Sequence, residues 1–231
     1  MLETKDLTLH YGGSQILNGL SMQAATGEVT CIMGTNGVGK TSLLKAISGT
    51  HPASGGEIVL DGETITKLPA HKLAHAGIGY VPQGRMIFPL LTVRENLETG
   101  LVCLPPGERT VPDRIFELFP VLKDMENRRG GDLSGGQQQQ LAIGRALVTR
   151  PKLLLMDEPT EGIQPNIIQL IGRVISQLRD EGQMAIVLVE QYFDFAYNLA
   201  DRFYVMRRGA VSFDARKADT THAEVQQAFS L

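Results

Sequence analysis

The 231-residue sequence lacks several features that would assign it to a membrane, to secretion or to nucleic acid. No apolar run approaches the roughly 20 residues that a membrane-spanning helix needs. Residues 1–6 lack the basic and then apolar pattern of a signal peptide, so we expect the chain to stay in the cytoplasm. Its 22 lysines and arginines are fewer than its 25 acidic residues, and the net charge of −3 provides no basic field. We therefore expect no nucleic-acid partner.

Cysteine is also scarce. The two cysteines, Cys31 and Cys103, do not have the spacing of metal ligands, and we assign them no function. Hydrophobic residues make up an ordinary 42% of the sequence. The length suits one well-packed α/β domain with a small inserted lobe.

A glycine-rich segment at residues 34–41 fits the phosphate-binding pattern G-x-x-x-x-G-K-[ST] at every fixed position. A β-prone run at 29–33 precedes it and a helical pattern at 42–47 follows it, so the loop lies between a strand and a helix. The glycines allow backbone N–H groups to turn onto a polyphosphate, and the helix N-terminus adds a partial positive charge. Lys40 supplies a full charge, and the Thr41 hydroxyl suits Mg²⁺. The sequence therefore predicts a nucleoside triphosphate with Mg²⁺, bound by Gly34, Thr35, Asn36, Gly37, Val38, Gly39, Lys40, Thr41 and Ser42.

A second candidate anion site is the run Leu133-Ser134-Gly135-Gly136-Gln137, which a helical pattern follows directly. Ser134 can cap that helix, and the two glycines expose backbone N–H groups. The sequence predicts that Ser134, Gly135, Gly136 and Gln137 form a second anion site. We expect the polar residues 138–140 to form an exposed first turn.

Polar side chains follow three predicted strands. The buried parallel strand at 153–156 ends at Asp157, a candidate Mg²⁺ partner through water, and Glu158, a candidate base that activates water. The strand at 78–82 ends at Gln83, which can reach a metal ion or a water, and the strand at 185–189 ends before Gln191. Because a buried parallel strand ends at the active-site edge of a sheet, we expect the two carboxylates Asp157 and Glu158 to lie there.

The remaining pattern predicts an α/β fold. A strand at 2–11 and a hairpin at 57–65 form an antiparallel layer, the stretch at 93–129 is helical with proline breaks, and a hairpin at 203–213 closes the chain. Tyr11 either stacks on a nucleotide base or packs into the sheet. The apolar segment at 85–91 is either a docking surface for another protein or part of the core.

These motifs, in this order, resemble those of the ATP-binding subunit of an ABC transporter over essentially the whole length. The resemblance implies a P-loop NTPase core of the ABC ATPase type, as a single domain over 1–231 with a helical lobe inserted at about 90–145. It implies that Tyr11 stacks on adenine and that Gln83 links Mg²⁺ to the transporter. It also implies that the Leu133–Gln137 signature completes the ATP site of a second ATP subunit, so that the dimer closes over two nucleotides.

A narrower resemblance is to the branched-chain amino-acid importer group and, within it, to the urea importer type. It is carried by Gly84-Arg85-Met86-Ile87-Phe88, Thr160-Glu161-Gly162-Ile163-Gln164-Pro165 and Val189-Glu190-Gln191-Tyr192-Phe193-Asp194. It implies a peripheral subunit on the inner face of the cell membrane that acts with permease subunits and, indirectly, with a solute-binding protein. The expected solute is urea or a related amide, with branched-chain amino acids as the alternative.

Two positions depart from the general family. Gln191 lies where the family has a histidine, and Gln164 corresponds to a position that is usually aspartate. Glutamine can donate a hydrogen bond to a γ-phosphate but carries neither a positive charge nor a transferable proton. We therefore expect a heterodimer with a different ATP subunit that carries the histidine, although a homodimer stays open.

Three other functions fit the sequence less well. A soluble ABC protein that acts on ribosomes or nucleic acid usually has two ATP modules or a long coiled coil, and this length has room for neither. A plain P-loop kinase leaves the signature unexplained. A non-catalytic subunit conflicts with the presence of Lys40, Asp157 and Glu158.

Overall fold

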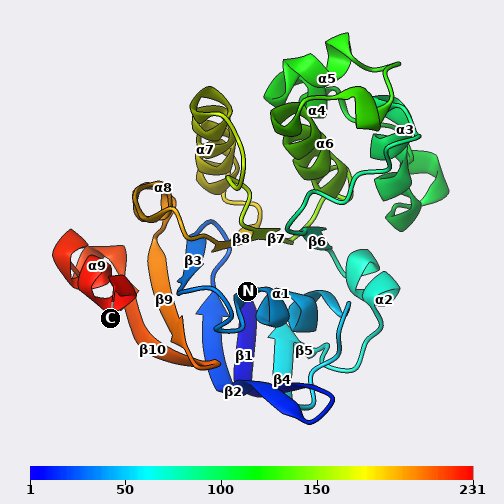
Figure 1. Ribbon diagram of the computed structural model, residues 1–231. Coiled ribbons are helices and arrows are strands. Elements are labelled where there is room, and N and C mark those ends of the chain that lie inside the picture. The colour runs from blue at the N-terminus through cyan, green and yellow to red at the C-terminus, as the bar shows by residue number, and fades with distance from the viewer. Residues whose placement is uncertain (231) are drawn as a thin grey trace.

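The computed structural model describes residues 1–230, which form two β-sheets with helices packed around them (Figure 1). The larger sheet has the order β10-β9-β3-β8-β7-β6, and all neighbours in it are parallel except β10 and β9. Its strands are β3 (Val29–Met33), β6 (Ile78–Val81), β7 (Leu153–Asp157), β8 (Ala185–Val189), β9 (Arg202–Arg207) and β10 (Ala210–Arg216). Every residue of β3, β7 and β8 is buried, because helices or the other sheet cover both faces.

The smaller sheet is antiparallel, with the order β2-β1-β4-β5. Its strands are β1 (Leu2–Tyr11), β2 (Ser14–Ala24), β4 (Gly55–Leu60) and β5 (Glu63–Thr64). The predicted strand at 2–11 and the hairpin with the Asp61-Gly62 turn are therefore present.

Most helices lie around the parallel sheet. Between β6 and β7 the chain forms a group of helices, which Figure 1 shows as the green lobe away from the antiparallel sheet. This lobe contains α3 (Val93–Glu98), α4 (Asp113–Leu118), α5 (Pro120–Asp124) and α6 (Gly135–Leu147), with short 3₁₀ turns between them. The other helices are α1 (Lys40–Ser48), α2 (Ala70–His75), α7 (Pro165–Asp180), α8 (Phe193–Leu199) and α9 (His222–Ser230). Within residues 1–230, no helix has both the length and the apolarity to cross a bilayer.

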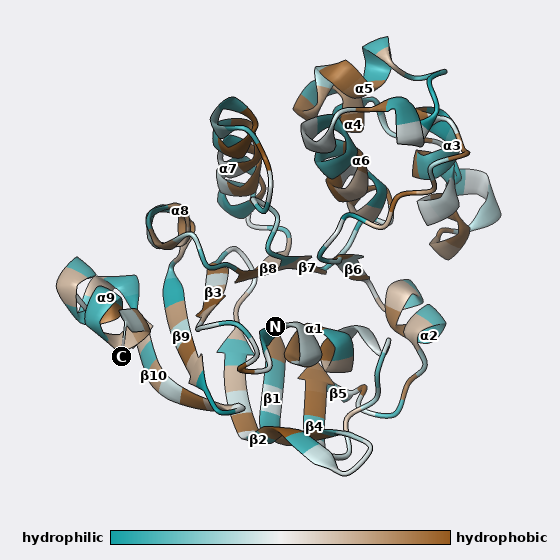
Figure 2. Cartoon of the chain, viewed as in Figure 1, coloured by the Kyte–Doolittle hydropathy of each residue, from teal (hydrophilic) through white to brown (hydrophobic). Residues whose placement is uncertain are grey.

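Two hydrophobic clusters lie on the two faces of the parallel sheet. Cys31 of β3 faces the cluster shared with the helical lobe, whereas Ile32 faces the cluster shared with α1 and the antiparallel sheet. Figure 2 shows the apolar strands of this sheet between more polar helices. The expected α/β fold with an antiparallel layer and an inserted helical lobe is confirmed.

One local expectation is wrong. Gln139 and Gln140 are only 4% and 2% exposed, so residues 138–140 are not an exposed first turn. Helix α6 packs against α3 and α5, and its buried residues begin at Gln139. The Gln140 side chain satisfies its amide by donating to the Gly136 carbonyl at 3.2 Å.

Candidate functional site

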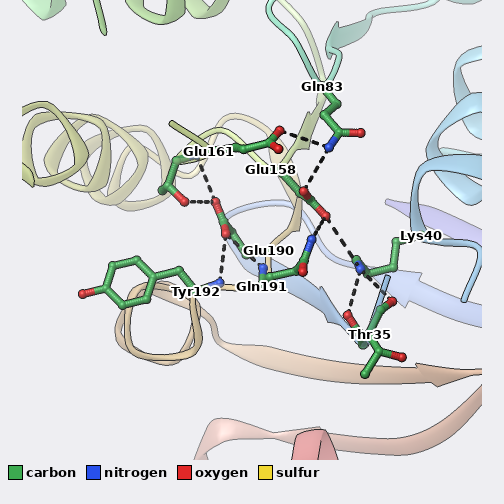
Figure 3. Close-up of polar contacts among 10 residues, drawn as sticks. Thr35, Lys40, Gln83, Glu158, Glu161, Glu190, Gln191 and Tyr192 are labelled. Carbon is green, nitrogen blue, oxygen red and sulfur yellow. Dashed lines mark hydrogen bonds and ion pairs between the residues drawn. The ribbon is translucent and has the colours of Figure 1, made fainter. Parts of the chain in front are cut away.

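Four loops meet at the carboxyl edge of the parallel sheet, after β3, β6, β7 and β8. The parallel ladders β3–β8, β8–β7 and β7–β6 place these strand ends next to one another. Figure 3 shows side chains from all four loops joined by polar contacts. This is the edge at which open α/β sheets bind ligands.

The loop after β3 can hold its shape only with glycine at two positions. Gly34 has φ +149°, and a Cβ there would lie 2.6 Å from the Met206 carbonyl oxygen. Gly39 has φ +106° and is the N-cap of α1, where a Cβ would lie 3.0 Å from Leu17. The absence of side chains leaves a backbone cradle that leads to a helix N-terminus, which suits a phosphate.

Lys40 is the cation of this cradle and is 5% exposed. Its ammonium donates to the carbonyl oxygens of Gly34 at 2.8 Å and Thr35 at 3.1 Å, and lies 3.7 Å from Glu158. Burial lowers the pKa of Lys40, and the nearby Glu158 and Asp157 carboxylates offset part of that effect. A phosphate is a stronger partner for the ammonium than these neutral carbonyls.

Asp157 ends β7 and is 1% exposed, yet within the described residues neither of its carboxylate oxygens has a hydrogen-bond partner. Burial raises the pKa of Asp157, while the nearby Thr41 hydroxyl, which makes no hydrogen bond of ordinary geometry to it, and the Lys40 ammonium lower it in part. Among residues 1–230, no group of three His, Cys, Asp or Glu side chains could hold a metal by itself. Nucleotide-bound Mg²⁺ uses only one or two protein oxygens, so Asp157 and Thr41 fit that ion.

Glu158 is the centre of the polar contacts in Figure 3. Its carboxylate accepts hydrogen bonds from Gln83 Nε2 at 3.1 Å and from Gln191 Nε2, and Gln83 also donates to Glu161 at 3.0 Å. Its backbone has φ +48°, a conformation that costs energy for residues with a side chain. The structure thus brings together Lys40, Gln83, Glu158 and Gln191, the residues for which we predicted catalytic roles.

Sequence analysis missed a second buried carboxylate, that of Glu190. It is 2% exposed and accepts hydrogen bonds from Thr160 and from the backbone N–H groups of Gln191 and Tyr192. Burial raises the pKa of Glu190, and these hydrogen bonds lower it in part. The available signal was an acidic residue directly after an apolar strand, which is the pattern that identified Asp157.

The signature lies elsewhere, at the start of α6. Ser134 is the N-cap, and its hydroxyl accepts from the Gln137 N–H at 3.4 Å while Gln137 Oε1 accepts from the Ser134 N–H at 2.9 Å. Together with Gly162, Gln164 and Ile167, the signature lines a cleft of about 560 Å³. We call this the signature cleft. None of the residues that contact Lys40 lines it.

Tyr11 ends β1 and is 38% exposed. Its ring centroid lies 4.3 Å from that of His51. The ring is therefore not buried in the sheet, and its stacking on adenine stays a prediction.

Comparison with known proteins agrees with this geometry. The sequence profile of the family described as ABC transporter matches residues 17–161. The chain is 42% identical to the high-affinity branched-chain amino acid transport ATP-binding protein BraG of Pseudomonas aeruginosa, with 99% of both chains covered. It is 31% identical to BraF of the same organism, which has the same description, over 91% of this chain and 89% of that protein.

A solved structure supports the fold assignment. The dimeric post-hydrolysis state of the ATP-binding cassette MJ0796, bound to ADP and Pi, superposes with a TM-score of 0.83 at 27% identity, covering 94% of this chain and 99% of that one. The chain belongs to the ABC transporter family, as one of its ATP-hydrolysing subunits.

Proposed function

We propose that this chain energises the import of a small polar solute by closing with a second ATP subunit over two nucleotides. The observation that carries this proposal is the separation of the signature cleft from the Lys40 site. A chain with two separate anion sites uses both when each nucleotide lies between two chains. The dimeric state of MJ0796 supports the same arrangement.

At this chain's own site, residues 34–42 hold the phosphates of ATP. Thr41, Gln83 and Asp157 provide oxygens for Mg²⁺, which neutralises phosphate charge when bound. Glu158 orients and deprotonates the attacking water, and the hydrogen bonds from Gln83 and Gln191 hold its carboxylate in place. Lys40 stabilises the charge on the terminal phosphate. Residues 1–231 act as one ATPase domain, with the helical lobe at about 90–145.

The segment after Gln83 is the proposed contact with a membrane permease. Three of its apolar side chains face solvent, since Met86, Phe88 and Leu90 are 67%, 48% and 79% exposed. Arg145 of α6 supports the segment, because it donates to the Met86 carbonyl at 2.7 Å and its guanidinium lies 5.2 Å from the Phe88 ring centroid. Exposed apolar side chains on a supported segment favour docking over core packing. The chain then lies on the inner face of the cell membrane.

The relatives BraG and BraF favour branched-chain amino acids as the solute, whereas the sequence motifs favour urea or a related amide. The 42% identity to BraG over the whole chain supports the amino-acid alternative, and nothing in the comparisons above supports urea. A BraF-like chain is the proposed second ATP subunit, because BraF and BraG occur in one organism and share a description. Gln191 and Gln164 would then make this chain's own site the slower of the two.

The test is affinity purification of this chain, carrying Glu158→Gln to trap the ATP-bound state, from its native membranes with ATP. We expect a permease pair and a second ATP subunit to co-purify, and the Lys40→Ala chain to recover less of the second ATP subunit. The wild-type complex, placed in vesicles with its binding protein, should hydrolyse ATP faster with leucine than with urea. Recovery of ribosomes or nucleic acid without a membrane protein would contradict the proposal.

A further inference from the structure

Glu190 joins two loops that lie on opposite sides of its carboxylate (Figure 3). One carboxylate oxygen accepts from the Thr160 hydroxyl at 2.7 Å and from the Thr160 backbone N–H at 3.1 Å. The other accepts from the backbone N–H groups of Gln191 at 3.0 Å and Tyr192 at 3.2 Å. All four groups donate, so the ionised carboxylate is the form that satisfies them.

The two loops serve different sites. The loop of Gln191 carries the amide that contacts Glu158 at the Lys40 site. Thr160 begins the other loop, its carbonyl accepts from the Ile163 N–H at 3.2 Å, and Gly162 in this loop lines the signature cleft. Glu190 therefore bonds to one loop of the chain's own nucleotide site and to one loop of the cleft proposed for the nucleotide of the second subunit.

We propose that Glu190 is a positioning residue that couples the Gln191 loop to the loop at 160–164, so that the two sites change together when the dimer closes. This inference rests on the proposed function, because it takes the signature cleft to hold a shared nucleotide. Hydrogen bonds to a buried charged acceptor are stronger than neutral ones at the surface. The Glu190 carboxylate thus holds the two loops together more firmly than neutral contacts would.

An amide of the same size cannot replace this carboxylate. Glutamine has one acceptor oxygen, and in either orientation its NH₂ group would face two donors. Glu190→Gln therefore removes the hydrogen bonds to one of the two loops and leaves the side-chain volume nearly unchanged. Thr160→Val removes only the hydroxyl donor, and Thr160→Ser keeps it, which makes the serine variant a matched control.

The experiment uses the purified transporter with the full chain. ATP titrations of hydrolysis give kcat and KM, and hydrogen exchange is followed in peptides that cover 158–165 and 189–193. We expect Glu190→Gln to lower kcat about tenfold or more, the size of losing hydrogen bonds to a charged group, with KM within about threefold of wild type. Thr160→Val should give a smaller loss in the same direction, and Thr160→Ser should match the wild type.

Hydrogen exchange distinguishes a loss of coupling between the two loops from a defect confined to one of them. In the wild type, ATP should slow exchange in both peptides, whereas in Glu190→Gln and Thr160→Val it should slow exchange only in 189–193. If both variants keep the wild-type kcat and ATP still protects both peptides, the coupling role is wrong. If Glu190→Gln does not fold, the two Thr160 variants decide the question in the same way. A wild-type complex that neither binds nor hydrolyses ATP would overturn the proposed function itself, and the coupling with it.

Discussion

Replacing Asp157 by asparagine should stabilise the nucleotide-free chain and, at the same time, weaken its stabilisation by ATP with Mg²⁺. Asp157 is 1% exposed, and neither carboxylate oxygen has a hydrogen-bond partner in the described part of the chain. A buried polar group without a partner costs about 1–3 kcal/mol, and a charged one costs more. Asparagine has nearly the same volume and remains polar but carries no charge, so the part of this cost that comes from the buried charge should disappear.

The expected gain in the free energy of unfolding is therefore about 1–3 kcal/mol. For a chain of this size, 1 kcal/mol corresponds to about 2–4 °C, so Tm should rise by about 2–12 °C. With ATP at about 100 times its Kd and excess Mg²⁺, the wild type should gain about 2.7 kcal/mol. The variant should gain less, because the neutral amide is a poorer ligand for a hard cation than a carboxylate.

The assay is thermal unfolding followed by circular dichroism, first in EDTA and then with ATP and Mg²⁺. Glu158→Gln is the matched control, since it removes one negative charge at the adjacent position. The Glu158 carboxylate has partners in Gln83, Gln191 and Lys40, so the control should not raise Tm in EDTA. A lower Tm for Asp157→Asn in EDTA, or an unchanged gain from ATP with Mg²⁺, would refute the reasoning.

Three further predictions concern single side chains of the two anion sites. Glu158→Gln should keep ATP binding and slow turnover at this chain's own site by about 10²- to 10⁴-fold, measured on the purified chain alone by fluorescent-nucleotide binding and phosphate release, and full residual activity would remove Glu158 from its role as base. Tyr11→Ala should weaken ATP binding by about 1–3 kcal/mol, the size of a base–aromatic stack, whereas Tyr11→Phe should not, and equal affinities would exclude stacking. Ser134→Ala should lower the free energy of unfolding by about 1 kcal/mol through loss of the α6 cap and should slow hydrolysis by the assembled complex, with Ser134→Thr as the control that keeps the cap.

The phosphate loop could be predicted from sequence because its geometry is local. Gly34 and Lys40 belong to one continuous strand–turn–helix unit, and the Lys40 ammonium reaches carbonyls only five and six residues away. The positive φ values of Gly34 and Gly39 follow from the same short pattern. No long-range contact has to be known to place these atoms.

Strand β2 shows where a local pattern fails. Its buried residues are Leu17, Leu20, Met22 and Ala24, so the alternation changes parity between 17 and 20. The pairing of β1 with β2 shifts register at this place, and Gly19 has φ +69°. A bulge inserts one extra residue, so that even-numbered side chains face the core after it where odd-numbered ones did before. A search for strict alternation of apolar and polar residues therefore does not detect this strand. The burial of Gln139 and Gln140 is a tertiary effect in the same sense, because their helix α6 packs against α3 and α5.

To predict the contact between Glu190 and Thr160 from sequence, one must know the order of the strands in the sheet; no further chemical rule is required. The two residues are 30 positions apart, and each follows a strand of apolar residues. In the parallel ladder of β7 and β8, Asp157 pairs with Val189, so the residues after these two leave the sheet side by side. A carboxylate after β8 then meets the N–H and hydroxyl of Thr160 in the loop after β7. The sequence shows the two strands and the carboxylate, but it does not show that β7 and β8 are neighbours, and the contact follows only from that adjacency.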